Sequence, residues 1–229
     1  MTTTNGIDKP TESSKPATTP YQYLDRPCPF LLRMIPKDGQ VVGSIGCGWG
    51  ATEAVLASQG REVHGVDISP VAIEVARTRL TSARVISPDD AEPFDAGSLD
   101  GLILGDVLEH MPLAWERLRT YTRSVTTGGW VVISVPNMLY ATALYHFLLR
   151  GDWPEHQAGI FDRTHVQVMT RRRLVRWCQT SGLQVECWFD RYGKPGTLLG
   201  RLYQAADYTS LRLLHDVFMV QLQCRCRKL

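Results

Sequence analysis

The stretch Val41-Val-Gly-Ser-Ile-Gly-Cys-Gly-Trp-Gly50 joins an apolar run to a cluster of glycines, and a second apolar run ends at Asp67. This pattern predicts a strand, a tight turn, a helix and a second, parallel strand. Glycines in such a turn let the backbone approach a ligand closely, and the N-terminus of the following helix attracts an anionic group. The carboxylate of Asp67, about 20 residues further on, can accept hydrogen bonds from both hydroxyls of a ribose. We therefore expect a nucleoside-bearing cofactor.

The glycine turn alone does not identify that cofactor. The spacing Gly46-x-Gly48-x-x-Ala51 fits proteins that bind nicotinamide or flavin dinucleotides as well as it fits proteins that bind S-adenosylmethionine. Both interpretations stay open on this motif, and the remainder of the chain has to separate them.

The composition is that of an ordinary globular protein. The chain has 229 residues and a net charge of +2, so we expect one α/β domain with a substantial core and no nucleic-acid partner. No apolar run has the length needed for stable membrane insertion, and no signal peptide is recognisable. The six cysteines lack zinc-binding spacing. We therefore expect reduced thiols, no metal site and a cytoplasmic location.

The N-terminal region changes character along its length. Residues 1–19 are rich in Thr, Ser, Pro and Lys, and we expect them to form a disordered tail ahead of a single domain over 20–229. In the segment 21–35, Pro27 and Pro29 are expected to prevent a helix. This segment either covers the glycine turn or packs at an edge of the domain.

Apolar runs predict further strands, and stretches with helical spacing separate them. The expected strands after Asp67 cover residues 84–87, 99–104, 130–135, 183–189 and 217–226. A helix over 112–125 is expected to end at Gly128-Gly129. Strands that alternate with helices indicate a doubly wound, mostly parallel sheet, whose ligands bind at the carboxyl ends of the strands. Several polar side chains fall at those ends: Asp67, Asp90, Asp106 and Asn137.

Six short motifs occur in this order: Ile-Gly-Cys-Gly-Trp-Gly (45–50), Val-Asp-Ile-Ser (66–69), Asp-Ala-Glu-Pro-Phe (90–94), Leu-Asp (99–100), Asp-Val-Leu-Glu-His (106–110) and Gly-Gly-Trp-Val-Val-Ile-Ser-Val-Pro-Asn (128–137). With Gly-Ile-Phe-Asp-Arg-Thr-His (159–165), the series resembles the class I S-adenosylmethionine-dependent methyltransferases, and within them the small-molecule branch that includes ubiquinone-biosynthesis enzymes. The resemblance implies a Rossmann-like sheet of seven strands with helices on both faces and an antiparallel last strand. It also implies S-adenosyl-L-methionine as cofactor, since a dinucleotide would leave the motifs at 90–94 and 106–110 unexplained.

The resemblance also implies a role for each matching position. Ser44, Gly46, Cys47, Gly48 and Gly50 would line the methionine part of the cofactor, Asp67 and Ile68 the ribose and adenine, Asp90 and Ala91 the edge of the adenine, and Gly105 and Asp106 the methionyl amine. The chain departs from the family at Ser44, where an acidic residue usually orients the glycine turn and the amine. Asp106 is expected to take over part of that task.

Methyl transfer is an in-line displacement, so the enzyme must align the acceptor and exclude water. A hydroxyl acceptor must also lose its proton, which favours a histidine base. The candidates are His110 and His165, although the backbone could instead hold either ring. We expect His165 to act, because Asp162 is close enough in sequence to orient its ring. The expected reaction is O-methylation of a small molecule in a biosynthetic pathway; the alternatives are N- or C-methylation and a cofactor-binding protein without turnover.

Two segments are expected to shape the acceptor side. Residues 138–165 are rich in aromatic and aliphatic side chains, and they form either a lid over the acceptor pocket or a helix packed on the sheet edge. Residues 196–215 show helical spacing, and they either extend the pocket or form a dimer face. The expected partners are a small-molecule acceptor and, through the second segment, another copy of the chain in a homodimer.

Overall fold

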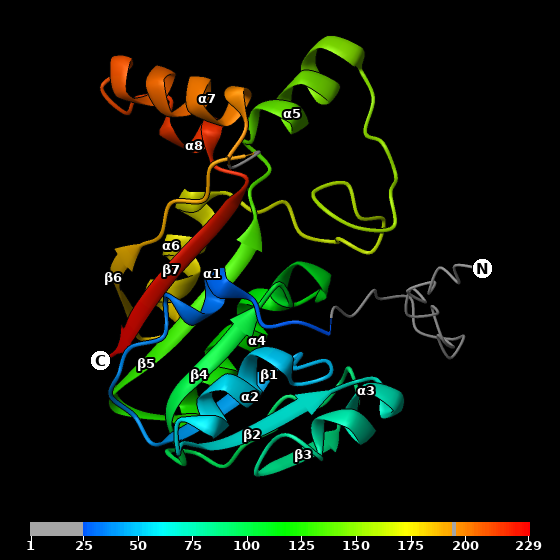
Figure 1. Ribbon diagram of the computed structural model, residues 1–229, viewed down its shortest axis with the longest axis vertical. Coiled ribbons are helices and arrows are strands. Elements are labelled where there is room, and N and C mark those ends of the chain that lie inside the picture. The colour runs from blue at the N-terminus through cyan, green and yellow to red at the C-terminus, as the bar shows by residue number, and fades with distance from the viewer. Residues whose placement is uncertain (1–24, 194–195) are drawn as a thin grey trace, which may run out of the picture.

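A seven-stranded sheet forms the centre of the molecule (Figure 1). The structure, a computed structural model, describes residues 25–193 and 196–229, and the expected disordered tail over 1–19 lies outside them. The strand order is β3-β2-β1-β4-β5-β7-β6, in which β7 runs antiparallel to both β5 and β6 and the other pairs are parallel. This confirms the expected doubly wound sheet with an antiparallel last strand. The strands are β1 (Val41–Ile45), β2 (Glu62–Asp67), β3 (Ser82–Val85), β4 (Leu99–Gly105), β5 (Val125–Pro136), β6 (Leu183–Trp188) and β7 (Gln221–Lys228).

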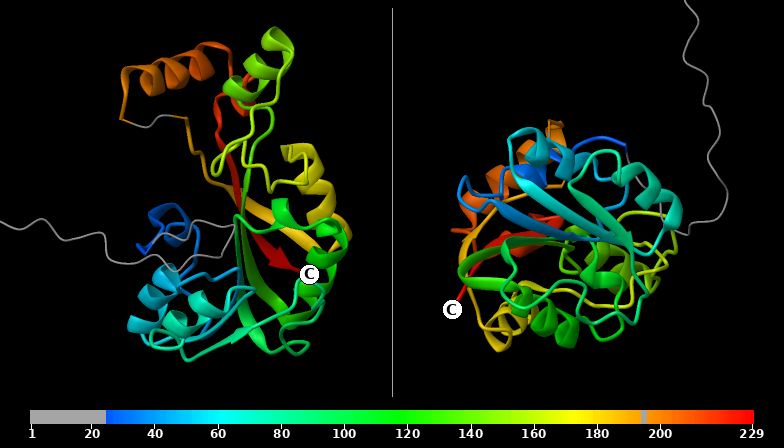
Figure 2. Two further views of the ribbon diagram at one scale, coloured as in Figure 1. Left: turned by 90° about the vertical axis from the view of Figure 1, so that its right-hand side faces the viewer. Right: turned by 90° about the horizontal axis from the view of Figure 1, so that it is seen from below.

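Helices cover both faces of this sheet, as the left view of Figure 2 shows. One face is packed by α1, α2 and α3, with Leu56 and Ile73 in the core, and the other by α4 and α6, with Leu118 and Trp177. The helices are α1 (Pro29–Leu32), α2 (Ala51–Ser58), α3 (Pro70–Ala76), α4 (Ala114–Tyr121), α5 (Ala141–Leu144), α6 (Arg171–Thr180), α7 (Leu198–Thr209) and α8 (His215–Phe218), together with the 3-10 turns η1 (Leu108–His110) and η2 (Thr122–Ser124) and the π-helix η3 (Tyr145–Arg150).

Two of these helices begin where side chains can cap them. The hydroxyl of Ser69 accepts a hydrogen bond from the backbone N–H of Ala72, and Pro70 follows at the first helical position of α3. Thr170 caps α6 in the same way by accepting from the N–H of Arg173. The two caps therefore satisfy backbone N–H groups at the starts of α3 and α6.

The expectation that prolines prevent a helix before residue 35 was wrong. Pro29 is the first residue of the short helix α1, a position whose backbone N–H would have no helical partner in any case. The N–H of Cys28 donates to the hydroxyl of Thr52 in α2, at 2.9 Å. The segment thus contacts α2, the helix that follows the glycine turn.

The boundary between α4 and β5 also differs from the expectation. Gly128 and Gly129 do not end a helix, because α4 stops at Tyr121 and β5 begins at Val125. A Cβ at Gly129 would lie 2.7 Å from the carbonyl oxygen of Asp100, so the close approach of two strands requires this glycine. The third and last strands are shifted by two or more residues from their expected positions, and α8 occupies the start of the expected last strand.

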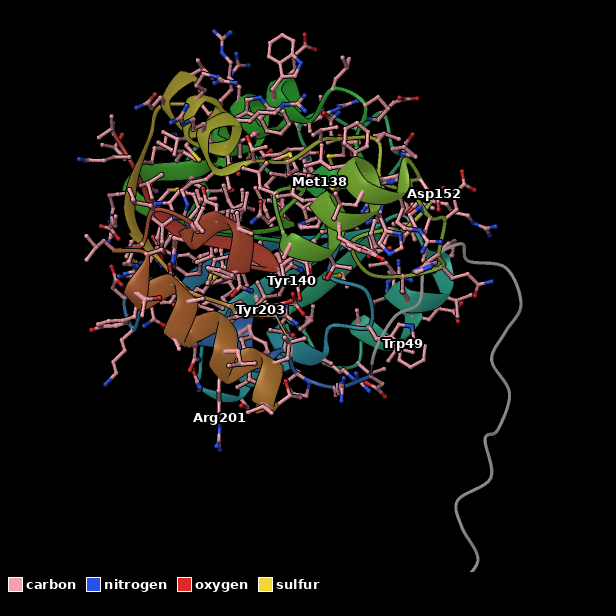
Figure 3. The ribbon with its side chains drawn as sticks, turned by 90° about the horizontal axis from the view of Figure 1, so that it is seen from above. Trp49, Met138, Tyr140, Asp152, Arg201 and Tyr203 are labelled. Atoms are coloured by element: carbon pink, nitrogen blue, oxygen red, sulfur yellow. The ribbon has the colours of Figure 1, made fainter. Side chains whose placement is uncertain are left out.

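A second layer stands above the carboxyl ends of β4 and β5 and consists of α5, η3, α7 and α8 (Figure 1). Tyr140 and Tyr203 face one another between α5 and α7, with ring centroids 6.2 Å apart, while Arg201 points outward (Figure 3). The amide of Asn137, at the end of β5, donates to the carbonyl oxygens of Asp216 and Met219 and so fastens α8 to the sheet. None of the described helices has the length and apolar character needed to cross a lipid bilayer.

Three of the cysteines pack together in the core. Cys178 of α6 and Cys224 and Cys226 of β7 are buried. The Sγ atom of Cys226 lies 3.8 Å from that of Cys178 and 3.9 Å from that of Cys224. All six cysteines are free thiols. This contact therefore joins α6 to β7 by packing of sulfur atoms.

Candidate active site

The glycine turn after β1 is held by the neighbouring strand β2. The N–H groups of Gly46 and Cys47 donate to the carbonyl oxygen of Val66, at 2.9 and 3.1 Å. Gly46 and Gly48 have φ values of +73° and +53°, which side chains rarely tolerate. The turn therefore presents its backbone, without side chains, to the space at the end of β1.

Asp67, at the end of β2, has both carboxylate oxygens oriented by backbone N–H groups. One oxygen accepts from Gly48 at 2.8 Å and the other from Ser69 at 2.9 Å. The side chain is buried, yet it borders the large cavity described next. The backbone thus fixes the orientation of this carboxylate beside the cavity, where its ribose role stays a prediction.

Two adjoining cavities lie at the carboxyl edge of the sheet. The larger has a volume of about 680 Å³, and the smaller, of about 110 Å³, lies beside the glycine turn. Gly46 and Gly105 border both. The predicted site residues on the wall of the larger cavity are Gly46, Asp67, Ile68, Gly105, Asp106, His110 and His165. Those on the wall of the smaller cavity are Ser44, Gly46, Cys47, Gly48 and Gly105.

Three predicted cofactor residues border neither cavity. Gly50 packs inward instead, since a Cβ there would lie 3.2 Å from Leu80. The carboxylate of Asp90 lies 3.6 Å from Arg84, and Asp89 takes the place on the cavity wall that we expected for Asp90 and Ala91. The adenine contacts assigned to Asp90 and Ala91 therefore stay predictions that this geometry does not favour.

Sequence reasoning missed Glu53, in the first turn of α2. The hydroxyl of Ser44 donates to Oε1 of Glu53 at 2.7 Å, both side chains are buried, and both border the smaller cavity. Burial raises the pKa of the Glu53 carboxyl. The available signal was the combination of a serine at the position of the usual acid and an acid nine residues later.

Asp106 follows β4 in a strained backbone conformation. Its φ is +53°, in the left-handed region that non-glycine residues seldom adopt. Oδ1 accepts hydrogen bonds from the hydroxyl of Ser134 at 2.8 Å and the amide of Gln221 at 3.1 Å. Burial raises the pKa of the Asp106 carboxyl. Asp106 also borders the large cavity, whose wall includes Asp67, His110 and His165.

His110 and His165 come together although 55 residues separate them, and their ring centroids are 4.9 Å apart. Nε2 of His165 lies 3.9 Å from Oε1 of the buried Glu109. Burial lowers the pKa of both histidines, so both imidazoles are neutral and able to accept a proton near neutral pH.

The hydrogen bonds of Asp162 differ from those we expected. Its carboxylate accepts from the backbone N–H and the hydroxyl of Thr164, and the Thr164 hydroxyl lies 2.9 Å from Nδ1 of His110. Asp162 therefore orients His110 through Thr164, whereas its effect on His165 is through charge. The sequence reason given for preferring His165 was incomplete, because the chain turns back between residues 162 and 165.

Glu109, His110 and His165 also form a group that could hold a metal ion. One donor atom from each lies within 4.8 Å of the others, and Oε2 of Glu109 is buried without a hydrogen-bond partner in the described part of the chain. Burial raises the pKa of Glu109 well above its usual value. Carboxylate and imidazole donors suit several divalent metals. Sequence reasoning expected no metal site and missed this arrangement.

Only the returning half of the insert over 138–165 borders the large cavity among the described residues. Gln157 to Ile160 form that wall, together with Asp162 and His165. Phe161 anchors the segment by edge-on contacts with His146, Trp153 and His156, at 5.0 to 5.6 Å. The exposed apolar residues of η3 and the residues of α7 take no part in the cavity wall as described. The lid role of the insert stays a prediction, and the pocket role of α7 is not favoured.

Several known proteins resemble this chain in sequence or in fold. The methyltransferase domain family matches residues 21–187. A ubiquinone biosynthesis O-methyltransferase from Thiobacillus denitrificans is 31% identical over 196 residues, which cover 80% of this chain and 83% of that protein. A second protein of that name, from Albidiferax ferrireducens, is 30% identical over 81% of this chain and 75% of its own length. A solved S-adenosylmethionine-dependent methyltransferase from Mesorhizobium loti shares the fold with a TM-score of 0.62 and 17% identity, over 87% of this chain and 96% of that one.

Proposed function

The chain belongs to the methyltransferase domain family. From that premise we propose that it transfers the methyl group of S-adenosylmethionine to an oxygen atom of a small molecule. The observation that carries the proposal is one cavity that contains both kinds of group the reaction needs. Asp67 and Ile68 border its cofactor side, and the neutral imidazoles of His110 and His165 border its other side.

Each of the two cavities would hold a different part of the cofactor. Asp67 would bind the ribose, Ile68 would pack against the adenine, and the glycine turn would accommodate the methionyl part in the smaller cavity. When bound, S-adenosylmethionine supplies an electrophilic methyl group. The chain's contribution is to align an acceptor with that methyl group and to exclude water.

A hydroxyl acceptor makes use of the histidines. We assign the base to His165, because it borders the cavity and the negative charge of Asp162 would stabilise the imidazolium formed by proton transfer. His110, held by Thr164, would position the hydroxyl beside it. An amine acceptor that reacts as the free base would need neither group.

A second route to the same chemistry rests on the spacing of Glu109, His110 and His165. A divalent metal ion held by these donors would lower the pKa of a bound hydroxyl and make a separate base unnecessary. The two routes differ in one measurable way: dialysis against a chelator abolishes activity only in the metal-assisted route.

The acceptor is proposed to be a hydroxylated compound with an apolar body. Ile86, Val107, Met111, Leu113 and Val220 contribute apolar side chains to the cavity wall. An apolar lining with a few convergent polar groups is typical of small-molecule sites. The names of the two relatives, ubiquinone biosynthesis O-methyltransferase, agree with such an acceptor.

The test is transfer of a labelled methyl group to matched acceptors. Catechol, 2-aminophenol and 1,2-diaminobenzene, each carrying an added alkyl chain, keep the shape of the acceptor and change only the nucleophilic atom. Labelled ether from the first two supports the proposal, and labelled amine alone would overturn it. Binding of S-adenosylhomocysteine with no labelled product from a broad metabolite extract would instead indicate a protein without turnover.

We further propose that the enzyme works in the cytoplasm as a homodimer without a nucleic-acid partner. The side chains of Leu198, Leu202 and Tyr208 on α7 are more than half exposed, and a second copy would cover them. Sedimentation of the wild type and of a Leu198→Glu, Leu202→Glu variant tests the dimer. A wild type that sediments as a monomer contradicts it.

A further inference from the structure

The smaller cavity contains a buried carboxylate from an unexpected element. Position 44 on β1, where the family resemblance implies an acid, is a serine, and its hydroxyl donates at 2.7 Å to Glu53 of α2. Glu53 is only 5% exposed and Ser44 only 1%. The carboxylate is therefore beside the position that lacks the acid, and it reaches the same cavity from a helix on the flank of the sheet.

This carboxylate has no cationic partner among the residues that the structure describes. No Lys, Arg or His there forms an ion pair with Glu53, although the exposed Arg26 borders the same cavity. Asp67, another carboxylate, is close enough to act on Glu53 through charge. A buried carboxyl in such surroundings holds its proton more tightly, and the pKa of Glu53 is raised. A buried charge without a partner is strongly unfavourable, so the site is suited to a cation that arrives from outside.

The neighbouring acid cannot easily serve that cation in place of Glu53. Oδ1 of Asp106 already accepts from Ser134 and Gln221, and Asp106 borders the larger cavity rather than the smaller one. Glu53 shares the smaller cavity with the bare backbone of Gly46, Gly48 and Gly105. A space of about 110 Å³ there suits a compact polar group such as an α-ammonium.

We propose that Glu53 binds the α-ammonium group of the methionyl part of S-adenosylmethionine, and that this chain has moved the binding acid from β1 to α2. The inference rests on the proposed use of S-adenosylmethionine. Ser44 holds the displaced carboxylate in place. Acids at positions 44 and 53 together would place two carboxylates in contact in a buried site, where both cannot be ionised at low cost. Ser44 and Glu53 therefore act as a pair.

The experiment compares two ligands that differ only in the amino-acid part. S-adenosylhomocysteine carries the α-ammonium, and 5′-methylthioadenosine lacks the amino-acid end. Calorimetry should show that Glu53→Gln binds S-adenosylhomocysteine about 10- to 100-fold more weakly than the wild type. This is the usual range for loss of a hydrogen bond to a charged group. The same variant should bind methylthioadenosine within about threefold of the wild type.

A double variant supplies the stricter test. Ser44→Asp combined with Glu53→Gln returns the acid to β1, and it should recover most of the lost affinity for S-adenosylhomocysteine. Ser44→Asp alone should bind more weakly than the double variant. Equal losses for both ligands in Glu53→Gln, or no recovery in the folded double variant, would overturn the assignment. A wild type that binds neither ligand would overturn the proposed cofactor itself, and the assignment with it.

Discussion

The cofactor side and the acceptor side of the site are built in different ways. The cofactor side comes from one continuous stretch, β1 to β2, and its key groups are backbone N–H groups and carboxylates that they hold. The acceptor side is assembled from residues far apart in sequence, such as His110, His165 and Val220. A ligand that never changes can be held by a local motif, whereas an acceptor that differs between enzymes is held by loops that can vary.

Each side also contains one buried glutamate, and their surroundings differ. Glu53 accepts a hydrogen bond from Ser44. Glu109 lies 3.9 Å from His165, and its Oε2 has no partner among the described residues. The first carboxylate is therefore prepared for a ligand, whereas the second is poised for a proton or a metal ion.

The largest expected effect of a substitution is on the acceptor side. His165→Asn should lower kcat by about 10²–10⁴-fold with a hydroxyl acceptor, because a general base contributes about that much. Affinity for S-adenosylhomocysteine should stay within about threefold, because the imidazole acts on the acceptor. Steady-state kinetics and calorimetry measure the two quantities.

The matched control is His110→Asn, which should lower kcat less, since His110 is assigned a positioning role. An equal loss in both variants, together with loss of activity in a chelator, would favour the metal-assisted route. Near-normal kcat in both would show that positioning alone is sufficient and would exclude the assigned base.

On the cofactor side, Asp67→Ala should weaken the binding of S-adenosylhomocysteine by about 1.5–3 kcal/mol in free energy, the range for hydrogen bonds to a charged group. Part of the loss comes from the glycine turn, because Gly48 and Ser69 also donate to this carboxylate. Asp67→Asn keeps one acceptor oxygen and should lose less. Unchanged affinity in a folded Asp67→Ala protein would contradict the ribose assignment.

The unliganded protein should become more stable when Glu109 is replaced by glutamine. Burial raises the pKa of this carboxyl well above its usual value, so the folded state keeps a proton that the unfolded state has lost. Stability therefore falls as pH rises from the ordinary carboxyl pKa toward the raised one. Glu109→Gln removes this dependence, and its advantage over the wild type should grow as the pH rises from about 5 to about 8.

Urea unfolding at the two pH values measures that difference. Glu53→Gln provides the comparison on the cofactor side, and it should show the same sign with a smaller size, because Ser44 stabilises the ionised form of Glu53. A constant difference across the pH range would show that Glu109 titrates normally in the folded protein.

The smallest expected effect is a change in the mobility of the insert when ligands bind. If the insert closes over the acceptor, amide exchange over 157–165 should slow when cofactor and acceptor are both bound. The helix α4 (114–121), packed on the sheet, should change less. Hydrogen exchange followed by mass spectrometry measures both segments, and equal changes would indicate that the insert is a static wall.

The cofactor side of the site could be predicted from the sequence more fully than the acceptor side. The glycine turn and the alternation of strands with helices depend on local spacing, so the doubly wound sheet could be predicted, and the structure confirms it. The antiparallel last strand followed only from the resemblance to the family. Glu53 was missed because an acid in the first turn of a helix is usually a solvated residue, and only the fold shows that it points back to Ser44.

The meeting of His110 with His165 could not be predicted from spacing, because it depends on how the chain returns after α5 and η3. The anchor for that return is Phe161, whose partners come from residues 146–156. Contacts between side chains of a long returning segment leave no local pattern in the sequence. Sequence spacing likewise could not show that Asp89 borders the cavity while the carboxylate of Asp90 lies 3.6 Å from Arg84.

The place of β7 in the sheet has a consequence for synthesis of the protein. β6 joins the sheet only through β7, which is made later and inserts between β5 and β6. While the nascent chain is still leaving the ribosome, β6 has no strand to pair with, and the flank of β5 stays open. Both are sites where another chain could add a strand. Slow translation between β6 and β7 should therefore increase the demand for chaperones, and rapid delivery of β7 should relieve it.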